Sequence, residues 1–164
     1  MGSLFEVSDI FEIAMRIEEN GSNFYRYAVQ IAKDEEAKKI FSHLADEEDK
    51  HKATFREMLS KIETHYPPEN YPDEYGAYLH NYADNNLIFK KEVLDKELAG
   101  ITDTLSAIDF AIRRELDSIL YYHEIKGFIH PSEHSTIDEI INEERRHFNL
   151  LSQTREKYAE EEER

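Results

Sequence analysis

The sequence predicts an all-α protein, a four-helix bundle of two antiparallel helical hairpins joined by a long, partly helical crossover. Apolar residues recur with the spacing of an amphipathic helix over four long segments. Short connections join the first segment to the second and the third to the fourth, and such connections place successive helices antiparallel. A much longer connection, residues 65–103, separates the two pairs. The 164 residues suffice for one sizeable core, so we expect a single domain over residues 1–164.

The first hairpin is expected to comprise helices over about residues 9–33 and 35–64. Asp9 and Glu12 have capping-box spacing at the start of the first helix, and Asp34 is the expected N-cap of the second. The apolar positions of the first helix are Ile10, Ile13, Ala14, Ile17, Phe24, Ala28 and Ile31. Those of the second are Ile40, Phe41, Leu44, Phe55, Met58 and Leu59. Both sets predict one buried face per helix.

The second hairpin is expected over about residues 104–127 and 132–158. Gly127 is the predicted C-terminal cap of its first helix, and Pro131 precedes its second. The crossover opens with proline-containing turns, after which residues 79–98 have a helical pattern in one or two pieces. This segment has three possible roles: completing the bundle, covering a site or forming an interface. The acidic residues 159–164 are expected to form a solvated tail.

Composition excludes several classes of function. The chain carries 36 acidic and 20 basic residues, a formal charge of −16, which argues against nucleic acid or an anionic membrane as a partner. The sequence has no cysteine, so disulfides, iron–sulfur clusters and cysteine-based zinc sites are excluded. We find no signal peptide and no apolar run long enough to span a bilayer, and we therefore expect a cytoplasmic protein.

One constellation of metal-ligand residue types occurs twice. Glu48 and His51 form a Glu-x-x-His pair, and Glu144 and His147 form another. An upstream helix carries a matching glutamate in each half, Glu18 before the first pair and Glu115 before the second. The two halves align at offsets of 97 residues for the glutamate helices and 96 for the Glu-x-x-His helices. This near-constant offset predicts a bundle with pseudo-two-fold symmetry.

The repeated constellation predicts a site for two metal ions. Glu and His three residues apart lie on nearly the same helix face, so both reach one point of the bundle interior. Four carboxylates balance the charge of two divalent ions, and mixed carboxylate and imidazole ligands suit Fe or Mn, although Zn also binds such sites. A single Glu-x-x-His in so acidic a chain would more often be a surface pair. The repeat and the partner glutamates favour the metal site.

The remaining histidines and two tyrosines have weaker claims. No Glu-x-x-His contains the other histidines, which are His43, His65, His80, His123, His130 and His134. We expect His43 and His123 to lie at helix surfaces. Tyr25 and Tyr122 each lie seven residues after a helix's glutamate, on nearly the same face. They are candidates for bonding a ligand carboxylate or relaying an electron, and ordinary core tyrosines are an equal alternative.

These residues resemble the rubrerythrin-like, ferritin-like diiron-carboxylate proteins. The stretch from Ile17 to Tyr25 is similar to the family's Glu-x-x-Gly-x-x-Phe-Tyr signature, and both Glu-x-x-His pairs match its ligand pairs. The resemblance implies a diiron centre bridged by glutamates, reaction with hydrogen peroxide or dioxygen, and a homodimer. Rubrerythrins proper have a cysteine-bearing rubredoxin-like domain and a further glutamate ligand. This sequence has no cysteine, and Ser118 occupies the ligand's place, with Gly21 at the corresponding place in the first half.

The leading hypothesis is therefore a diiron oxidoreductase that reduces hydrogen peroxide or dioxygen in oxidative-stress defence. Its electrons would come from a separate donor protein, because this chain has no thiol or cluster to hold them. The alternative is a ferritin-like protein that binds or sequesters iron without significant turnover. A third reading is a structural bundle whose site is vestigial or holds zinc.

Overall fold

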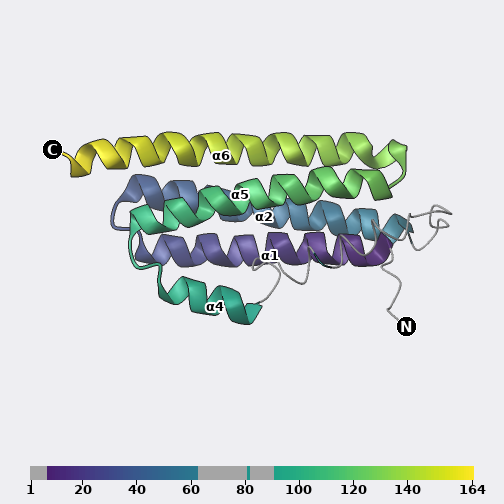
Figure 1. The fold of residues 1–164 in the computed structure, drawn as a ribbon, viewed down its shortest axis with the longest axis horizontal. Helices are drawn as coiled ribbons and strands as arrows, with labels where there is room; N and C mark the ends of the chain where they lie inside the picture. Colours follow the sequence, from purple (N-terminus) through teal and green to yellow (C-terminus); the bar gives the residue numbers. More distant parts are fainter. Residues whose placement is uncertain (1–6, 63–80, 82–90) are drawn as a thin grey trace.

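The fold is a bundle of four long helices (Figure 1). The computed structural model describes residues 7–62, 81 and 91–164, and these residues include no strand. The long helices are α1 (Val7–Ile31), α2 (Glu35–Ile62), α5 (Thr104–Ile125) and α6 (His134–Glu162). A short helix, α4 (Lys91–Ala99), lies beside α1. The predicted all-α, four-helix architecture is confirmed. None of the described helices combines the length and apolar character needed to cross a membrane.

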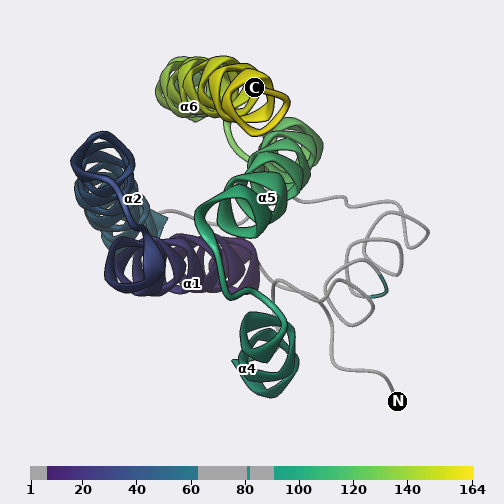
Figure 2. The ribbon, with the colours of Figure 1, turned by 90° about the vertical axis from the view of Figure 1, so that its left-hand side faces the viewer.

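The long helices pair as two hairpins, α1 with α2 and α5 with α6 (Figure 2). Local capping explains where two of them begin. The Asp34 carboxylate accepts a hydrogen bond of 2.8 Å from the backbone N–H of Ala37 at the start of α2. Asp103 and Ser106 form a reciprocal capping box at the start of α5. Helices α2 and α5 therefore begin where side chains satisfy the first helical N–H groups.

Several predicted helix ends differ from the structure. Helix α1 begins at Val7, so Asp9 lies in its first turn, where a carboxylate interacts favourably with the helix dipole. The prediction of Gly127 as a C-terminal cap is wrong: α5 ends at Ile125, and Gly127 lies in a 3₁₀ turn without a positive φ. Burial of Phe128 in the core accompanies this tightening of the chain. Helix α6 continues to Glu162, so most of the predicted tail is exposed helix.

Only part of the crossover lies within the described residues. Helix α4 is its final helical piece, and residues 63–80 and 82–90, which include most of the predicted 79–98 segment, lie outside them. The Tyr27 hydroxyl donates to the carbonyl oxygens of Leu98 at 3.2 Å and Ile101 at 2.6 Å. These bonds fix the end of the crossover against α1.

The core consists of two apolar clusters with a polar layer between them. One cluster joins the start of α1, the end of α2, the end of α5 and the start of α6 around Ile17, Phe55 and Tyr122. The other joins the opposite parts of the helices around Phe24, Leu44 and Leu151. Several kcal/mol of burial energy from large side chains such as these stabilise the bundle on each side. The clusters thereby hold the helices in register across the polar layer.

Candidate metal centre

The structure brings all six predicted metal ligands together in the polar layer. They come from four helices: Glu18 from α1, Glu48 and His51 from α2, Glu115 from α5, and Glu144 and His147 from α6. Each is at most 5% exposed. Charged side chains are rarely buried to this extent unless they are paired or bind metal. The layer is therefore built from residues that would be costly in an ordinary core.

The six residues form two overlapping groups of four. One group contains Glu18, Glu48, His51 and Glu144, and the other contains Glu48, Glu115, Glu144 and His147. Within each group the ligand atoms, one from each residue, all lie within 4.8 Å of one another. Glu48 and Glu144 belong to both groups. The geometry thus provides two adjacent four-ligand positions with two shared glutamates.

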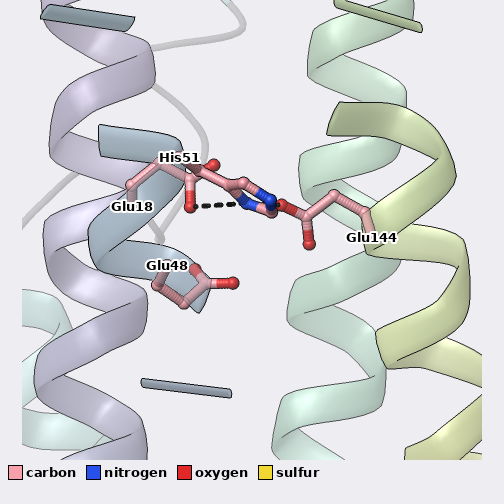
Figure 3. A group of neighbouring side chains, drawn as sticks. All are labelled: Glu18, Glu48, His51 and Glu144. Atoms are coloured by element: carbon pink, nitrogen blue, oxygen red, sulfur yellow. Dashed lines mark ion pairs between the residues drawn. The ribbon is translucent and has the colours of Figure 1, made fainter. Parts of the chain in front are cut away.

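The first group centres on the imidazole of His51 (Figure 3). His51 Nδ1 lies 2.9 Å from Glu144 Oε1 and 3.5 Å from Glu18 Oε2. Its other ring nitrogen, Nε2, lies 2.5 Å from Glu143 Oε2. A carboxylate on the outer nitrogen fixes the ring orientation and the tautomer, as is usual for metal-binding histidines.

The second group centres on the imidazole of His147. His147 Nδ1 lies 3.4 Å from Glu144 Oε2 and 3.8 Å from both Glu48 Oε1 and Glu115 Oε2. The two imidazoles stack with their centroids 5.7 Å apart. Glu144 therefore directs one oxygen toward each histidine.

The donor atoms that face the centre of the layer fit a cation. Among the described residues, seven buried side-chain atoms lack a hydrogen-bond partner, and six of them belong to the predicted ligands. They are Glu18 Oε2, Glu48 Oε1, His51 Nδ1, both carboxylate oxygens of Glu144, and His147 Nδ1. A buried acceptor without a partner costs about 1–3 kcal/mol or more when charged. Two metal ions would satisfy all six atoms, so the residues present fit the predicted dimetal site.

Burial and mutual repulsion change the acid–base properties of the layer. Burial raises the pKa of Glu18, with Glu144 adding to the effect, and it raises the pKa of Glu48 and Glu115 well above the ordinary range. Burial opposes charging of His51, but Glu18 and Glu144 beside it raise its pKa overall. Without metal, the layer therefore holds protons that metal ions would displace.

Two tyrosines each bond to a predicted ligand glutamate on the other hairpin. The Tyr25 hydroxyl donates to Glu115 Oε1, and the Tyr122 hydroxyl donates to Glu18 Oε1. Each tyrosine thus bonds to the glutamate of the opposite half of the repeat. One oxygen of Glu18 and one of Glu115 are held in this way. The other oxygen of each, Oε2, faces the histidines of the layer. Of the roles considered for Tyr25 and Tyr122, the structure supports a hydrogen bond to a predicted ligand carboxylate.

Two residues at the site were not anticipated from the sequence. Glu143 contacts His51. The sequence signal for this residue is that the repeat has a glutamate at the same place in both halves, Glu47 and Glu143. Arg114, on α5, is 3% exposed and its Nη2 lies 2.9 Å from Glu48 Oε2. Arg114 directly precedes Glu115 in the sequence, but the helical pattern does not show that its side chain points into the bundle.

The other described histidines lie away from this centre. His43 and His123 are exposed, as expected, and His123 Nε2 is 3.2 Å from the Arg145 guanidinium. His130 contacts Ser132, and His134 lies 3.2 Å from the carbonyl oxygen of Ile129. His65 and His80 fall outside the described residues.

Comparisons with known proteins agree with this geometry. The family described as Rubrerythrin matches residues 9–155. A crystal structure from Thermotoga maritima, of a protein assigned as ferritin-like and diiron-carboxylate, is similar with 30% sequence identity and a TM-score of 0.62. The similarity covers 95% of this chain and 98% of that one. No curated protein matches the chain at a comparable level of significance.

Proposed function

The chain belongs to the rubrerythrin family, and from that premise we propose that it binds two iron ions and reduces hydrogen peroxide or dioxygen. The proposal includes a separate donor protein that returns the electrons, and a role in oxidative-stress defence. The observation that carries it is the pair of four-ligand groups that share Glu48 and Glu144. Two Fe(II) ions held side by side could together supply the two electrons of such a reduction.

The ligands and their supports each have a part in this proposal. Glu18 and His51 would hold one ion, and Glu115 and His147 the other. The phenols of Tyr25 and Tyr122 hold one oxygen of Glu115 and one of Glu18, respectively. Each of these glutamates would then offer its other oxygen to an ion. Apolar clusters on both sides keep the layer dry, which strengthens electrostatic interactions within it.

The electron count supports a cycle between ferrous and ferric ions. Held by the two four-ligand groups, a pair of Fe(II) ions would supply the two electrons which, with two protons, convert hydrogen peroxide to two waters. Burial raises the pKa of Glu48 and Glu115, which favours their protonation in the absence of metal. These carboxylates can therefore hold protons as well as bind metal. Because the sequence has no cysteine, the proposal assigns re-reduction to another protein.

The test is anaerobic loading of the metal-free protein with two equivalents of Fe(II), followed by rapid mixing with peroxide or dioxygen. We expect ferric absorbance to develop within seconds, and two equivalents of Fe(II) to be consumed per peroxide. Glu144→Ala, which removes a shared ligand, should abolish the rapid phase. Iron that binds tightly but remains ferrous over minutes with both oxidants would contradict the oxidoreductase and favour the iron-binding alternative.

A further inference from the structure

Arg114 is a permanently charged group inside the polar layer. Its side chain lies in the bundle interior and the residue is 3% exposed, whereas the adjacent Arg113 is exposed. Its Nη2 donates to Glu48 Oε2 at 2.9 Å and to the carbonyl oxygen of Ile17 at 3.1 Å. One guanidinium therefore links α5 to both helices of the other hairpin. Burial of a charge is tolerated only where such partners compensate it.

The space for this guanidinium exists because residue 21 is glycine. A Cβ atom at Gly21 would overlap Arg114 Nη2 and Glu48 Oε2. Gly21 lies within the 25-residue helix α1, where glycine costs about 1 kcal/mol relative to alanine. The close approach of two charged side chains explains the glycine. Arg114 and Gly21 therefore act as a matched pair on facing helices.

The contacts of Arg114 make the two shared glutamates unequal. Both oxygens of Glu144 face the layer without a hydrogen-bond partner, one toward each histidine. Only Oε1 of Glu48 is in that state, since Oε2 is bonded to Arg114. We propose that Arg114 is a positioning residue that reserves one oxygen of Glu48, so that Glu144 spans both metal ions and Glu48 offers Oε1 alone. This inference rests on the metal binding proposed above and is independent of the oxidant.

The positive charge of Arg114 has a second consequence for the same site. It offsets one of the four carboxylate charges, and it does so with or without metal because a guanidinium does not lose its proton. It therefore stabilises the metal-free layer and opposes the entry of divalent cations. A purely structural arginine would instead stabilise the metal-free and metal-bound forms equally.

The experiment compares Arg114→Met with Arg113→Met, a matched control at the adjacent exposed position. Zn(II) affinity is measured by calorimetric competition, and thermal unfolding is followed with and without Zn(II). For Arg114→Met we expect a lower melting temperature without metal, a larger rise on adding Zn(II), and Zn(II) binding tighter by at least about tenfold. Arg113→Met should behave as the wild type. Unchanged or weaker Zn(II) binding by Arg114→Met would overturn the proposal.

A second variant moves the guanidinium without removing its charge. Gly21→Ala places a Cβ atom where Arg114 Nη2 and Glu48 Oε2 lie, so it should break the bond between them and change the Co(II) absorption spectrum, as Arg114→Met does. Asn23→Ala, at an exposed position on the same helix, is the control. A spectrum identical to the wild type in both Gly21→Ala and Arg114→Met would contradict the assigned role.

A structure of the Zn(II)-loaded wild type gives the direct answer. We expect Arg114 to remain bonded to Glu48 Oε2 while Glu144 contacts both ions. Coordination of Zn(II) by both oxygens of Glu48 would overturn the inference and leave the proposed function intact. Failure of the wild type to bind any metal would overturn both.

Discussion

The shared position of Glu144 makes a prediction about how many ions each variant keeps. Glu144 belongs to both four-ligand groups, whereas Glu18 belongs to one and Glu115 to the other. Replacing Glu144 by alanine leaves three ligands in each group. Replacing Glu18 leaves the group around His147 complete. We therefore expect two tightly bound ions in the wild type, one in Glu18→Ala and in Glu115→Ala, and none in Glu144→Ala.

The same count sets the size of the stabilisation by metal. At a metal concentration of about 100 times Kd, one bound ion stabilises the folded chain by about 2.7 kcal/mol. In a chain of this size 1 kcal/mol raises the melting temperature by about 2–4 °C, so each ion adds about 5–11 °C. The wild type should therefore show about twice the rise of Glu18→Ala, and Glu144→Ala almost no rise.

Native mass spectrometry of Zn(II)-loaded protein measures the count, and thermal unfolding with and without Zn(II) measures the stabilisation. Glu139→Ala, at an exposed position on the same helix as Glu144, is the control and should keep both ions. Retention of one tight ion by Glu144→Ala, or loss of both by Glu18→Ala, would refute the shared-ligand geometry.

Three further predictions follow from the contacts around the ligands. Glu143→Gln removes the charged partner of His51 Nε2 and should weaken Zn(II) binding by about 10- to 100-fold in calorimetry. Tyr122→Phe leaves Glu18 Oε1 without its donor and should lower the free energy of unfolding of the metal-free chain by about 1–3 kcal/mol in urea. Burial, together with Glu144, raises the pKa of Glu18 above 4.5, so its contribution to folding is complete below that pH and is lost as pH rises through the folded-state pKa. The melting temperature of the metal-free wild type should therefore fall relative to that of Glu18→Gln as pH rises from about 5 to 8.

Each of these predictions has a control and a contradicting result. Glu139→Gln should bind Zn(II) as the wild type does, and equal affinity in Glu143→Gln would contradict the orienting role. Tyr27→Phe should destabilise the chain without changing metal affinity, because Tyr27 bonds to the crossover. A constant difference in melting temperature between wild type and Glu18→Gln across that pH range would show that Glu18 does not titrate differently on folding.

The architecture and the ligand set were accessible from the sequence because both depend on periodic patterns. Helical apolar spacing predicted the four long helices, and near-equal offsets between the halves predicted which glutamates meet the two Glu-x-x-His pairs. Helix ends were less accessible, since tertiary packing decides them. Gly127 has the residue type of a helix cap, but the chain around it enters a 3₁₀ turn with Phe128 buried in the core.

Arg114 was not accessible from the repeat because its counterpart in the first half is an isoleucine, Ile17. Two arginines stand side by side before Glu115, and local pattern does not decide which of them faces inward. The available signal was the combination of a glycine inside helix α1 and a charged residue where the other half has an apolar one. Each observation alone has ordinary explanations. Their connection is visible only in the structure, where Gly21 on α1 lies against Arg114 on α5.

The predicted ligands and the two tyrosines that bond to them follow the repeat. The charged residues that contact the predicted ligands do not, and the difference lies between α2 and α6. Both ligands on α2 are held by side chains from other helices: Glu48 by Arg114, and His51 by Glu143. On α6, by contrast, both oxygens of Glu144 lack a hydrogen-bond partner. The repeat equivalent of Glu143 is engaged elsewhere, since Glu47 pairs with Lys50 at 2.5 Å. Glu144 contacts the two histidines of the site but is held by no side chain outside it, so a change in its mode of binding breaks the fewest contacts. Carboxylate rearrangement on metal binding is therefore expected at Glu144, with α2 as the fixed side of the site.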